Sequence, residues 1–285
     1  MTKVFGGFTE AQEFLKKSFQ TAPEVHAQKW QGFDVSERPE AKMIELLLEN
    51  YRVPIHTEDL DHWRKDIPAN FPWADDHFEE RVCGFPINPG IQWAKWPWGN
   101  KAKDSLDLRG TMFNHNYMER YWPKYAGMAE NPTATVEDWS FIDNSWVGEH
   151  KAEPIPNHGI REQYGDLNDL VNTLSTEPDT RQAYYPMFFP EDVTVKGRKP
   201  CSLGYHFILR HGYFHCVYYM RSCDFYRHWA DDCYLTLRLQ LWVLEKCRAL
   251  NPDVWNDVKP GFLEMHVTSL HMFINDAPLM GIERR

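Results

Sequence analysis

The sequence predicts an α+β protein in which a mixed or mostly antiparallel sheet is backed by one long buried helix. Segments rich in Tyr, Phe, Val and Ile at residues 181–189, 202–220 and 265–273 are typical of strands. A long apolar segment at 235–250, which contains Trp242, lies between the last two of them and predicts the helix behind the sheet. The order of helices and strands along the chain indicates one domain spanning residues 1–285.

Two helices are expected before the strands. Residues 9–20 begin with Thr9, an N-cap candidate with Gln12 at the spacing of a capping box. Residues 41–51, "AKMIELLLENY", follow Pro39, a typical start signal, and predict a stronger helix.

The middle of the chain has less regular patterns. Residues 52–130 are crowded with Pro, Trp, Gly and Asn, which predicts irregular, aromatic-rich structure with short helices. Residues 131–158 have the composition of a surface insertion. Residues 164–180 have apolar side chains at i, i+3, i+4 and i+7, which predicts an amphipathic helix that ends at the turn "EPDT". Gly212, in the middle of the strand-rich segment 202–220, predicts a hairpin turn.

Composition excludes several classes of protein. The formal net charge of −10 argues against direct nucleic-acid binding, which requires clustered Lys and Arg. No apolar run has the length of a membrane span, and the N-terminus does not have the pattern of a signal peptide. Six cysteines without a CxxC pair argue against a disulfide framework or a zinc site, and reduced thiols in the cytoplasm are expected.

Cys201 is a candidate nucleophile. By residue type alone, a lone cysteine in a strand is more often a packing residue. Pro200 places it at the start of a strand, where a side chain can face a cavity, and Arg198, Lys199 and Arg221 are cations near it in sequence or in the expected hairpin. A cation beside a thiol lowers the thiol pKa and favours the reactive thiolate.

Two further polar groups follow Cys201. "RSCD" contains Arg221, Ser222 and Asp224, and a guanidinium with a hydroxyl suits a phosphate; an ordinary ion pair between Arg221 and Asp224 explains the pattern equally well. Asp231 and Asp232 precede the long apolar helix, where one acid is enough for an N-cap, so the other is available for another role.

The order and spacing of these residues resemble the central motif of the thymidylate synthase family. "PCSLGYHFILRHGYFHCVYYMRSCDFYRHWADD" is similar to that motif throughout, including "RSCD". "EPDTRQ" resembles the family's phosphate loop, "IQWAKW" its folate-side Trp segment, "HNYMERYW" a tyrosine segment and "SLHMF" a sugar-binding strand. The resemblance extends over about residues 75–280.

The resemblance implies roles for residues that their own patterns would assign to packing. The implied nucleotide-binding residues are Arg181, from the partner subunit of a homodimer, with Arg221, Ser222, Asp224, His271 and Tyr117. The implied folate-binding residues are Trp93 and Trp96. Gln182, Tyr121 and Phe273 depart from the residues that are usual at their positions, and Phe273 lacks the hydroxyl that holds the sugar.

Asp232 is the most informative departure. A thymidylate synthase has Asn at this position to read uracil, whereas an Asp here resembles the residue of the deoxycytidylate hydroxymethylase branch. A carboxylate accepts a hydrogen bond from the 4-amino group of cytosine, and its protonated form, or a water molecule, can serve N3. The O4 of uracil would oppose it at a cost of about 1–3 kcal/mol. The ending "MGIERR" also differs from the apolar tail that excludes water in thymidylate synthases.

The resemblance therefore implies a phage-type enzyme that converts dCMP, 5,10-methylenetetrahydrofolate and water to 5-hydroxymethyl-dCMP and tetrahydrofolate. Cys201 would attack C6 of the base, and no metal is required. Glu80 is the preferred upstream acid or base, with Glu79 and Glu45 as alternatives. The expected partners are a pyrimidine nucleoside monophosphate, folate and a second copy of the chain, in the cytoplasm of a phage host.

Three alternatives stay open. The same fold would also suit a C5 methylase or hydroxymethylase of dUMP, dCMP or CMP. A non-catalytic nucleotide-binding protein of this fold would have no need for a thiol at Cys201. A Cys-His amidase would need His206 or His215 to serve Cys201, and no local signature supports either.

Overall fold

The fold is that of a computed structural model, which describes residues 2–30, 33–38, 41–88, 90–97, 108–109, 112–113, 116–123, 164–193 and 199–284. The expected insertion at 131–158 lies outside these residues, as does Arg198.

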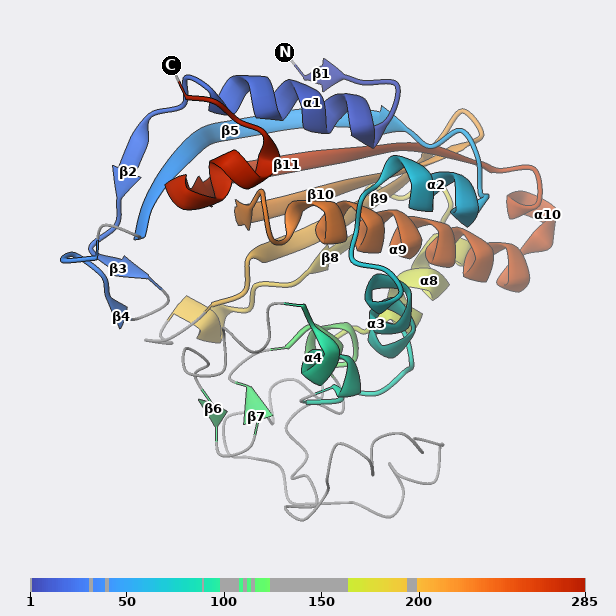
Figure 1. The fold of residues 1–285 in the computed structure, drawn as a ribbon. Helices are drawn as coiled ribbons and strands as arrows, with labels where there is room; N and C mark the ends of the chain where they lie inside the picture. The colour runs from blue at the N-terminus through green and yellow to red at the C-terminus, as the bar shows by residue number, and fades with distance from the viewer. Residues whose placement is uncertain are drawn as a thin grey trace.

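The centre of the fold is a seven-stranded mixed sheet in the order β1-β5-β11-β10-β9-β8, with β2 paired to β5 (Figure 1). The strands are β1 (Lys3–Val4), β2 (Glu24–His26), β5 (Lys42–Pro54), β8 (Tyr184–Pro186), β9 (Ser202–Arg210), β10 (Tyr213–Asp224) and β11 (Lys259–Phe273). Two pairs of strands, β1 with β5 and β10 with β11, are parallel, and the others are antiparallel. The sheet therefore confirms the predicted α+β class.

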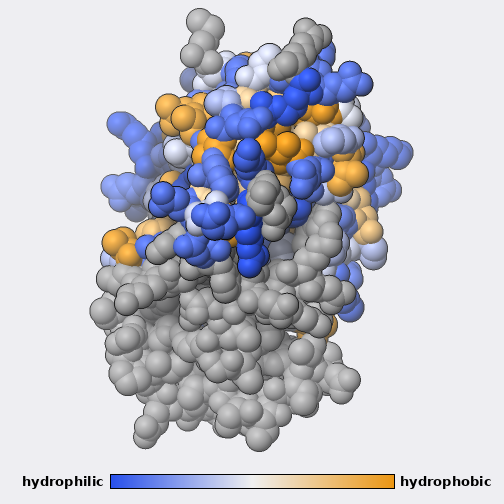
Figure 2. All heavy atoms as spheres, turned by 60° about the vertical axis from the view of Figure 1, so that its left-hand side comes forward, coloured by the Kyte–Doolittle hydropathy of each residue, from blue (hydrophilic) through white to orange (hydrophobic). Residues whose placement is uncertain are grey.

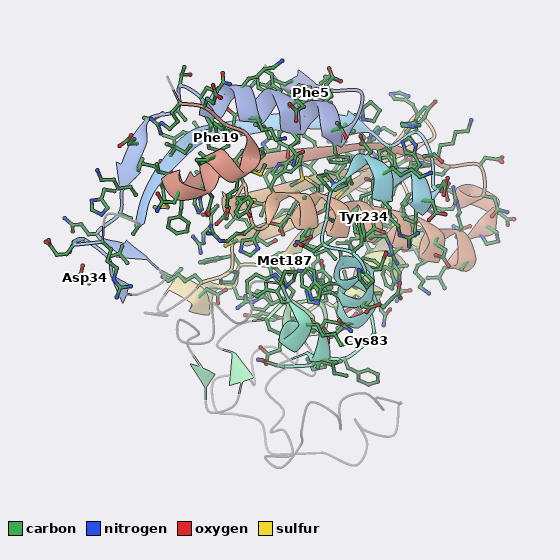
Figure 3. All side chains as sticks on the ribbon, in the orientation of Figure 1. Phe5, Phe19, Asp34, Cys83, Met187 and Tyr234 are labelled. Atoms are coloured by element: carbon green, nitrogen blue, oxygen red, sulfur yellow. The ribbon has the colours of Figure 1, made fainter. Side chains whose placement is uncertain are left out.

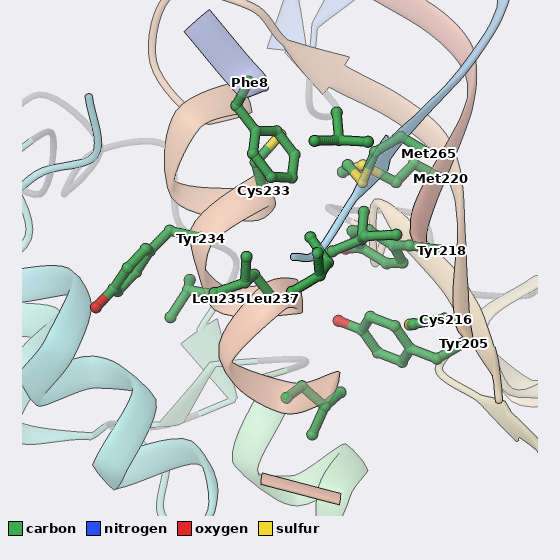
Figure 4. Packing of buried hydrophobic residues seen from close by; sticks show 14 of the residues in the cluster. Phe8, Tyr205, Cys216, Tyr218, Met220, Cys233, Tyr234, Leu235, Leu237 and Met265 are labelled. Carbon is green, nitrogen blue, oxygen red and sulfur yellow. The ribbon is translucent and has the colours of Figure 1, made fainter. Parts of the chain in front are cut away.

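The long helix α9 (Trp229–Leu250) covers one face of the sheet, with α1 (Phe8–Phe19) beside it (Figure 1). Side chains from α9 and α1 face residues of the strands in the core (Figure 4). The core side chains labelled there are Phe8, Tyr205, Cys216, Tyr218, Met220, Cys233, Tyr234, Leu235, Leu237 and Met265. Figure 3 shows how the side chains fill the space between these layers.

Shorter elements surround this core. They are α2 (Leu60–Asp66), α3 (Trp73–Arg81), α4 (Ile91–Lys95), α6 (Tyr117–Tyr121), α8 (Leu167–Thr176) and α10 (Pro252–Trp255), the 3-10 turns η5 (Pro190–Val193) and η6 (Ile274–Met280), and the two-residue strands β3 (Lys29–Trp30), β4 (Phe33–Asp34), β6 (Leu108–Arg109) and β7 (Met112–Phe113). Short helices thus occur in the described part of the predicted irregular region. The amphipathic helix α8 begins at Asp166 with a capping box and confirms that prediction.

The predicted helix at 41–51 is wrong, because these residues belong to the 13-residue strand β5. Their helix-forming side chains are overruled by pairing with β1, β2 and β11, which places β5 in the interior of the sheet. Leu48 has a φ of 57°, an uncommon value for a residue other than glycine, while the register of β5 with β11 is the same on both sides of it.

Two predicted helix starts are also wrong. Gly7, not Thr9, is the N-cap of α1, and the carboxylate of Asp66 in α2 accepts hydrogen bonds from the backbone N–H groups of Phe8 and Thr9. A side chain 58 positions away along the chain thus replaces the local capping box. Helix α9 begins at Trp229, six residues before the predicted start at 235, with His228 as its N-cap, so Asp231 and Asp232 lie inside its first turn.

The hairpin between β9 and β10 confirms the predicted turn. His211 and Gly212 both have positive φ values, 53° and 77°, as a tight two-residue hairpin turn requires. The predicted strand at 181–189 is shorter than expected, because only Tyr184–Pro186 pair with β9 and the chain then turns into η5.

The face of the molecule in Figure 2 carries mainly hydrophilic side chains in its described part, with smaller apolar groups between them. In the described residues, no helix has both the length and the apolar character needed to cross a membrane.

Candidate active site

Cys201 lies immediately before β9, next to the end of β10. The backbone N–H of Arg221 donates to the carbonyl oxygen of Cys201 at 2.9 Å, which ties the two segments together. The Arg221 guanidinium donates to the carbonyl oxygens of Pro200 and Lys199, at 2.7 and 2.8 Å, and lies 3.9 Å from the Cys201 sulfur. The predicted pairing of a cation with this thiol is therefore present for Arg221.

The parallel register of β10 and β11 collects further polar groups at the same end of the sheet. Ser222 lies opposite Ser269, and Asp224 lies opposite His271. The Ser222 hydroxyl is 3.4 Å from Nδ1 of His271. His271 is buried, which lowers its pKa, while the charges of Asp224 and Glu45 oppose this effect. Ser222 and His271 thus lie in one polar cluster with Arg221 and Cys201 at its edge.

Asp224 holds the turn from β10 into α9. One of its carboxylate oxygens accepts hydrogen bonds from the N–H groups of Tyr226 and Arg227, both at 3.0 Å, and the other accepts from the Arg227 guanidinium at 2.9 Å. The ion pair of this acid is therefore with Arg227, and the alternative of a simple Arg221–Asp224 pair is wrong. Its position beside His271 keeps it next to the predicted nucleotide site.

The neighbouring acids Asp231 and Asp232 have different partners. Asp231 accepts two hydrogen bonds at 2.8 Å from the backbone and side-chain amides of Asn70, and burial raises its pKa to about 6. Asp232 accepts from the thiol of Cys223, with the sulfur 3.6 Å from Oδ2. Asp231 therefore serves the structure of the loop before α3, and Asp232 faces the strand that carries Arg221 and Ser222.

The carboxyl of Asp232 is poised between its two protonation states near neutral pH. Burial raises its pKa to about 7 and the Asp231 charge raises it further, whereas the Arg81 charge and the Cys223 hydrogen bond lower it. Such a group can accept a hydrogen bond when ionised and donate one when neutral.

Glu80 lies on α3, and its buried carboxylate is hydrogen-bonded through both oxygens. Oε1 accepts from the backbone N–H of Gln92 at 3.1 Å, and Oε2 is 3.0 Å from Nδ1 of His77. Arg81 Nε in turn donates to Nε2 of His77 at 2.9 Å. Because Nε2 accepts, the proton of this ring is on Nδ1, which donates to Glu80. His77 is neutral, since burial and the Arg81 charge lower its pKa to about 4.

Sequence reasoning missed Arg81 and His77. The Arg81 side chain is buried, and its guanidinium lies over the Tyr117 ring at 4.4 Å. The carbonyl of Arg81 accepts from the indole of Trp122 at 2.9 Å. The i, i+4 spacing of His77 and Arg81 places both on one face of a helix, but α3 has too weak an apolar pattern to show which face is buried.

The aromatic residues implied for the site are Trp96 and Trp93, for folate, and Tyr117, for the nucleotide. Trp96 stacks on the ring of His228, with centroids 5.2 Å apart and 15° between the planes. Because His228 is the N-cap of α9, this pair lies beside the helix that carries Asp232. Trp93 lies on α4, and its side chain is outside the described residues. Tyr117, on α6, contacts Arg81.

Of the remaining predicted residues, Arg181 and Glu79 face solvent, whereas Glu45 lies beside the cluster, opposite His271 in the register of β5 with β11. Arg181 is exposed, and its carbonyl lies 3.1 Å from Nε2 of His206. Glu79 is exposed and pairs with Arg238. Glu45 lies on β5, where it accepts from the hydroxyl of Ser269 at 2.5 Å.

Together, these elements define an α+β sheet protein with a thiol and a guanidinium at one end of the sheet and a titrating carboxyl opposite them. No group of side chains suited to a metal ion occurs among the described residues.

Comparison with known proteins shows which proteins this chain is similar to. The family model "Thymidylate synthase" matches residues 90–228. A curated thymidylate synthase of Rhodopseudomonas palustris (strain BisA53) is 24% identical over 242 residues, which cover 82% of this chain and 70% of that protein. The crystal structure of thymidylate synthase from T4 phage is similar in fold, with a TM-score of 0.57, 16% identity, and coverage of 97% of this chain and 80% of the other. The chain is thus similar in sequence to a thymidylate synthase and to the family model over residues 90–228, and similar in fold to a solved thymidylate synthase.

Proposed function

We propose that this protein is a deoxycytidylate 5-hydroxymethyltransferase that acts through a covalent Cys201 adduct. Similarity to thymidylate synthases supports one-carbon transfer to C5 of a pyrimidine. The observation that carries the finer proposal is the position of Asp232, a half-buried carboxyl with a pKa of about 7, on the helix that faces the Cys201 end of the sheet. An acid at this position suits the 4-amino group of cytosine better than the O4 of uracil.

The residues near Cys201 suit its role as the nucleophile. Arg221 lies beside the sulfur, and a nearby cation favours the thiolate. Attack of the thiolate on C6 of the base makes C5 nucleophilic, so that C5 can take up a one-carbon unit. Loss of the C5 proton to a base and departure of tetrahydrofolate leave an exocyclic methylene at C5, water adds to this methylene, and loss of the Cys201 thiolate from C6 releases the 5-hydroxymethyl product.

The nucleotide would be held by its phosphate and sugar as well as its base. Arg221 and Ser222 supply a guanidinium and a hydroxyl for the 5′-phosphate. Arg181, which is exposed, would reach the phosphate of a partner subunit in a homodimer. His271 and Tyr117 would contact the sugar and the base, and Asp224 keeps the turn between β10 and α9 in place.

The one-carbon donor would be 5,10-methylenetetrahydrofolate, which supplies a carbon at the oxidation level of formaldehyde. The stacked pair of Trp96 and His228 offers a flat aromatic surface that fits a pterin ring. We propose Trp93, on the preceding helix α4, as a second folate contact.

Two carboxyl groups are proposed for proton transfer. Asp232 has a pKa near neutrality, which is the range in which a general acid or base works best at physiological pH. Glu80 is linked to the same region through His77 and Arg81. In this arrangement Asp232 faces the base. Glu80, on α3, takes part from the side of the pocket that α3 forms.

The nearest competing function is a C5 methylase, or a hydroxymethylase that takes dUMP or CMP. A non-catalytic nucleotide-binding protein is disfavoured by the thiol beside Arg221, because binding alone does not require it.

The products of one incubation separate these functions. The protein is incubated with dCMP and methylenetetrahydrofolate, and the nucleotide is analysed by mass spectrometry and the folate by absorbance. We expect a hydroxymethyl group on the nucleotide and release of tetrahydrofolate. Release of dihydrofolate with a methylated base would instead identify a methylase. The variant Cys201→Ala should have no turnover; turnover that survives this change would contradict the covalent mechanism.

A further inference from the structure

The strongest feature that the proposed reaction does not use is a buried cation on α3. Arg81 is only 5% exposed, and a guanidinium stays protonated in proteins. No carboxylate of the described residues lies within ion-pair distance of it. Burying a charge is costly, so a buried guanidinium with no carboxylate beside it among the described residues points to a use for that charge.

The position of Arg81 is determined by a chain of hydrogen bonds. Nε donates to His77, which donates to Glu80, whose other oxygen accepts from the backbone of Gln92 at the start of α4. The face of the guanidinium rests on the Tyr117 ring. Nε is therefore committed to His77, and the Tyr121 hydroxyl is a further hydrogen-bond partner of the Arg81 side chain.

Helix α3 packs against α9, which carries Asp232 in its first turn. The Arg81 charge acts on the Asp232 carboxyl and favours its ionised form. It is the only cation among the described groups that influence this carboxyl. The other groups are Asp231 and Cys233 from α9, and Cys223 and Tyr218 from β10.

We propose that Arg81 is a specificity-determining positioning residue, which acts on the base through Asp232 and is itself held by His77 and Glu80. This inference rests on the proposed role of Asp232 as the reader of position 4 of the base. An ionised Asp232 offers only acceptors, which match the 4-amino group of cytosine and oppose the O4 of uracil. A neutral Asp232 can donate to O4, so its discrimination is weaker.

The role assigned to Arg81 also explains the arrangement of Glu80. The Glu80 carboxylate accepts from both Gln92 and His77. It is well placed to keep the proton of His77 on Nδ1, which leaves Nε2 free to accept from Arg81.

The test compares Arg81→Met, which removes the charge, with Arg81→Lys, which keeps it. Arg238→Met is the matched control, since Arg238 lies at the α3–α9 contact over Phe78 but pairs with Asp75. Two quantities are measured from pH 5.5 to 9. One is the titration of Asp232 by carbon NMR of carboxyl-labelled aspartate, assigned with Asp232→Asn. The other is the ratio of the dissociation constants of dUMP and dCMP, by calorimetry.

In the wild type, we expect the ratio to favour dCMP more strongly as Asp232 ionises with rising pH. Arg81→Met should move both the titration of Asp232 and the rise of the ratio upward by about one pH unit, as expected for the loss of one nearby opposite charge. Arg81→Lys should retain most of the wild-type behaviour, and Arg238→Met all of it. In the Asp232→Asn background, Arg81→Met should leave the ratio unchanged.

An Asp232 titration that is unaffected by Arg81→Met would overturn the inference. So would a titration that moves while the ratio does not, because Arg81 would then have no part in reading the base. If Asp232→Asn itself leaves the ratio unchanged, the proposed reading of the base by Asp232 fails. That outcome is distinct from a ratio that responds to Asp232→Asn and not to Arg81→Met.

Discussion

The Arg221 guanidinium lies 3.9 Å from the Cys201 sulfur and also donates to the carbonyl oxygens of Lys199 and Pro200, the two residues before Cys201. One side chain thus shapes the backbone that carries the nucleophile and supplies a cation to its thiol. A phosphate that binds Arg221 would therefore be held next to the reacting sulfur.

Loss of the Arg221 charge should make Cys201 less reactive. We expect Arg221→Gln to slow alkylation of Cys201 by iodoacetamide roughly tenfold at pH 7, because the thiolate fraction falls when a neighbouring cation is removed. The rate is measured by peptide mass spectrometry in a Cys83→Ser background, since Cys83 is exposed. Arg210→Gln, on the same hairpin, is the control and should react like the parent. Equal rates in all three proteins would show that Arg221 does not activate the thiol.

The pH dependence of stability should reflect the half-buried acid Asp232. Its pKa is raised from 3.8 to about 7, so the folded state holds its proton more tightly than the unfolded state. Its presence therefore lowers the free energy of unfolding as pH rises from about 4 to about 7. Asp232→Asn removes this cost, and should gain roughly 1–3 kcal/mol relative to wild type between pH 5 and 8, since one pKa unit is about 1.4 kcal/mol. Urea titrations at several pH values measure the gain.

The adjacent acid Asp231 provides the contrast. Both of its oxygens accept from Asn70, and an Asn side chain at this position has a single acceptor. The pKa of Asp231 is also raised, to about 6, so Asp231→Asn removes a similar cost at pH 7, but it also loses about 1–3 kcal/mol by leaving a buried donor unsatisfied, and its net gain should be smaller than that of Asp232→Asn. The preference for dCMP over dUMP should change little, unlike in Asp232→Asn. Identical effects of the two substitutions would contradict the division of roles between these neighbours.

A methyl group at Gly90 tests the link from Glu80 to His77. A Cβ on Gly90 would collide with the Glu80 carboxylate and displace it from His77. We expect Gly90→Ala to lower kcat/KM roughly 10- to 100-fold, as a small misplacement in a positioned site can do, with little change in Tm. In Gly165→Ala, the added carbon would meet Asp169 at an ordinary 3.7 Å, and this control should keep full activity. Equal activity of the two variants would count against a role for Glu80.

The buried pair of Arg120 and Asp192 should contribute strongly to stability. Two hydrogen bonds of 2.7 Å join them, and both side chains are almost completely buried. Arg120→Met should cost about 3–5 kcal/mol, because it leaves a buried carboxylate without its partner. The double variant Arg120→Met/Asp192→Leu should recover much of this loss. Denaturant unfolding measures both, and a double variant no more stable than the single one would show that the pair itself is stabilising.

Local patterns determined the parts of the fold that depend on nearby residues. The hairpin at Gly212 requires positive φ values that glycine tolerates, and α8 has an apolar stripe and its own capping box. The spacing from Cys201 to Arg221 equals one hairpin, so antiparallel pairing brings its two ends together. This is why the sequence could predict that Arg221 lies beside Cys201.

The tertiary structure decided what depends on partners far away in the chain. The strand β5 has helix-forming residues, and only its neighbours in the sheet make it a strand. Asp66 caps a helix across 58 positions, which no local pattern reveals. Arg81 and Asp232 belong to separate helices, and their coupling arises because α3 packs on α9. Burial and the approach of charges are properties of the packed chain, so the pKa of Asp232 and the role inferred for Arg81 depend on the fold.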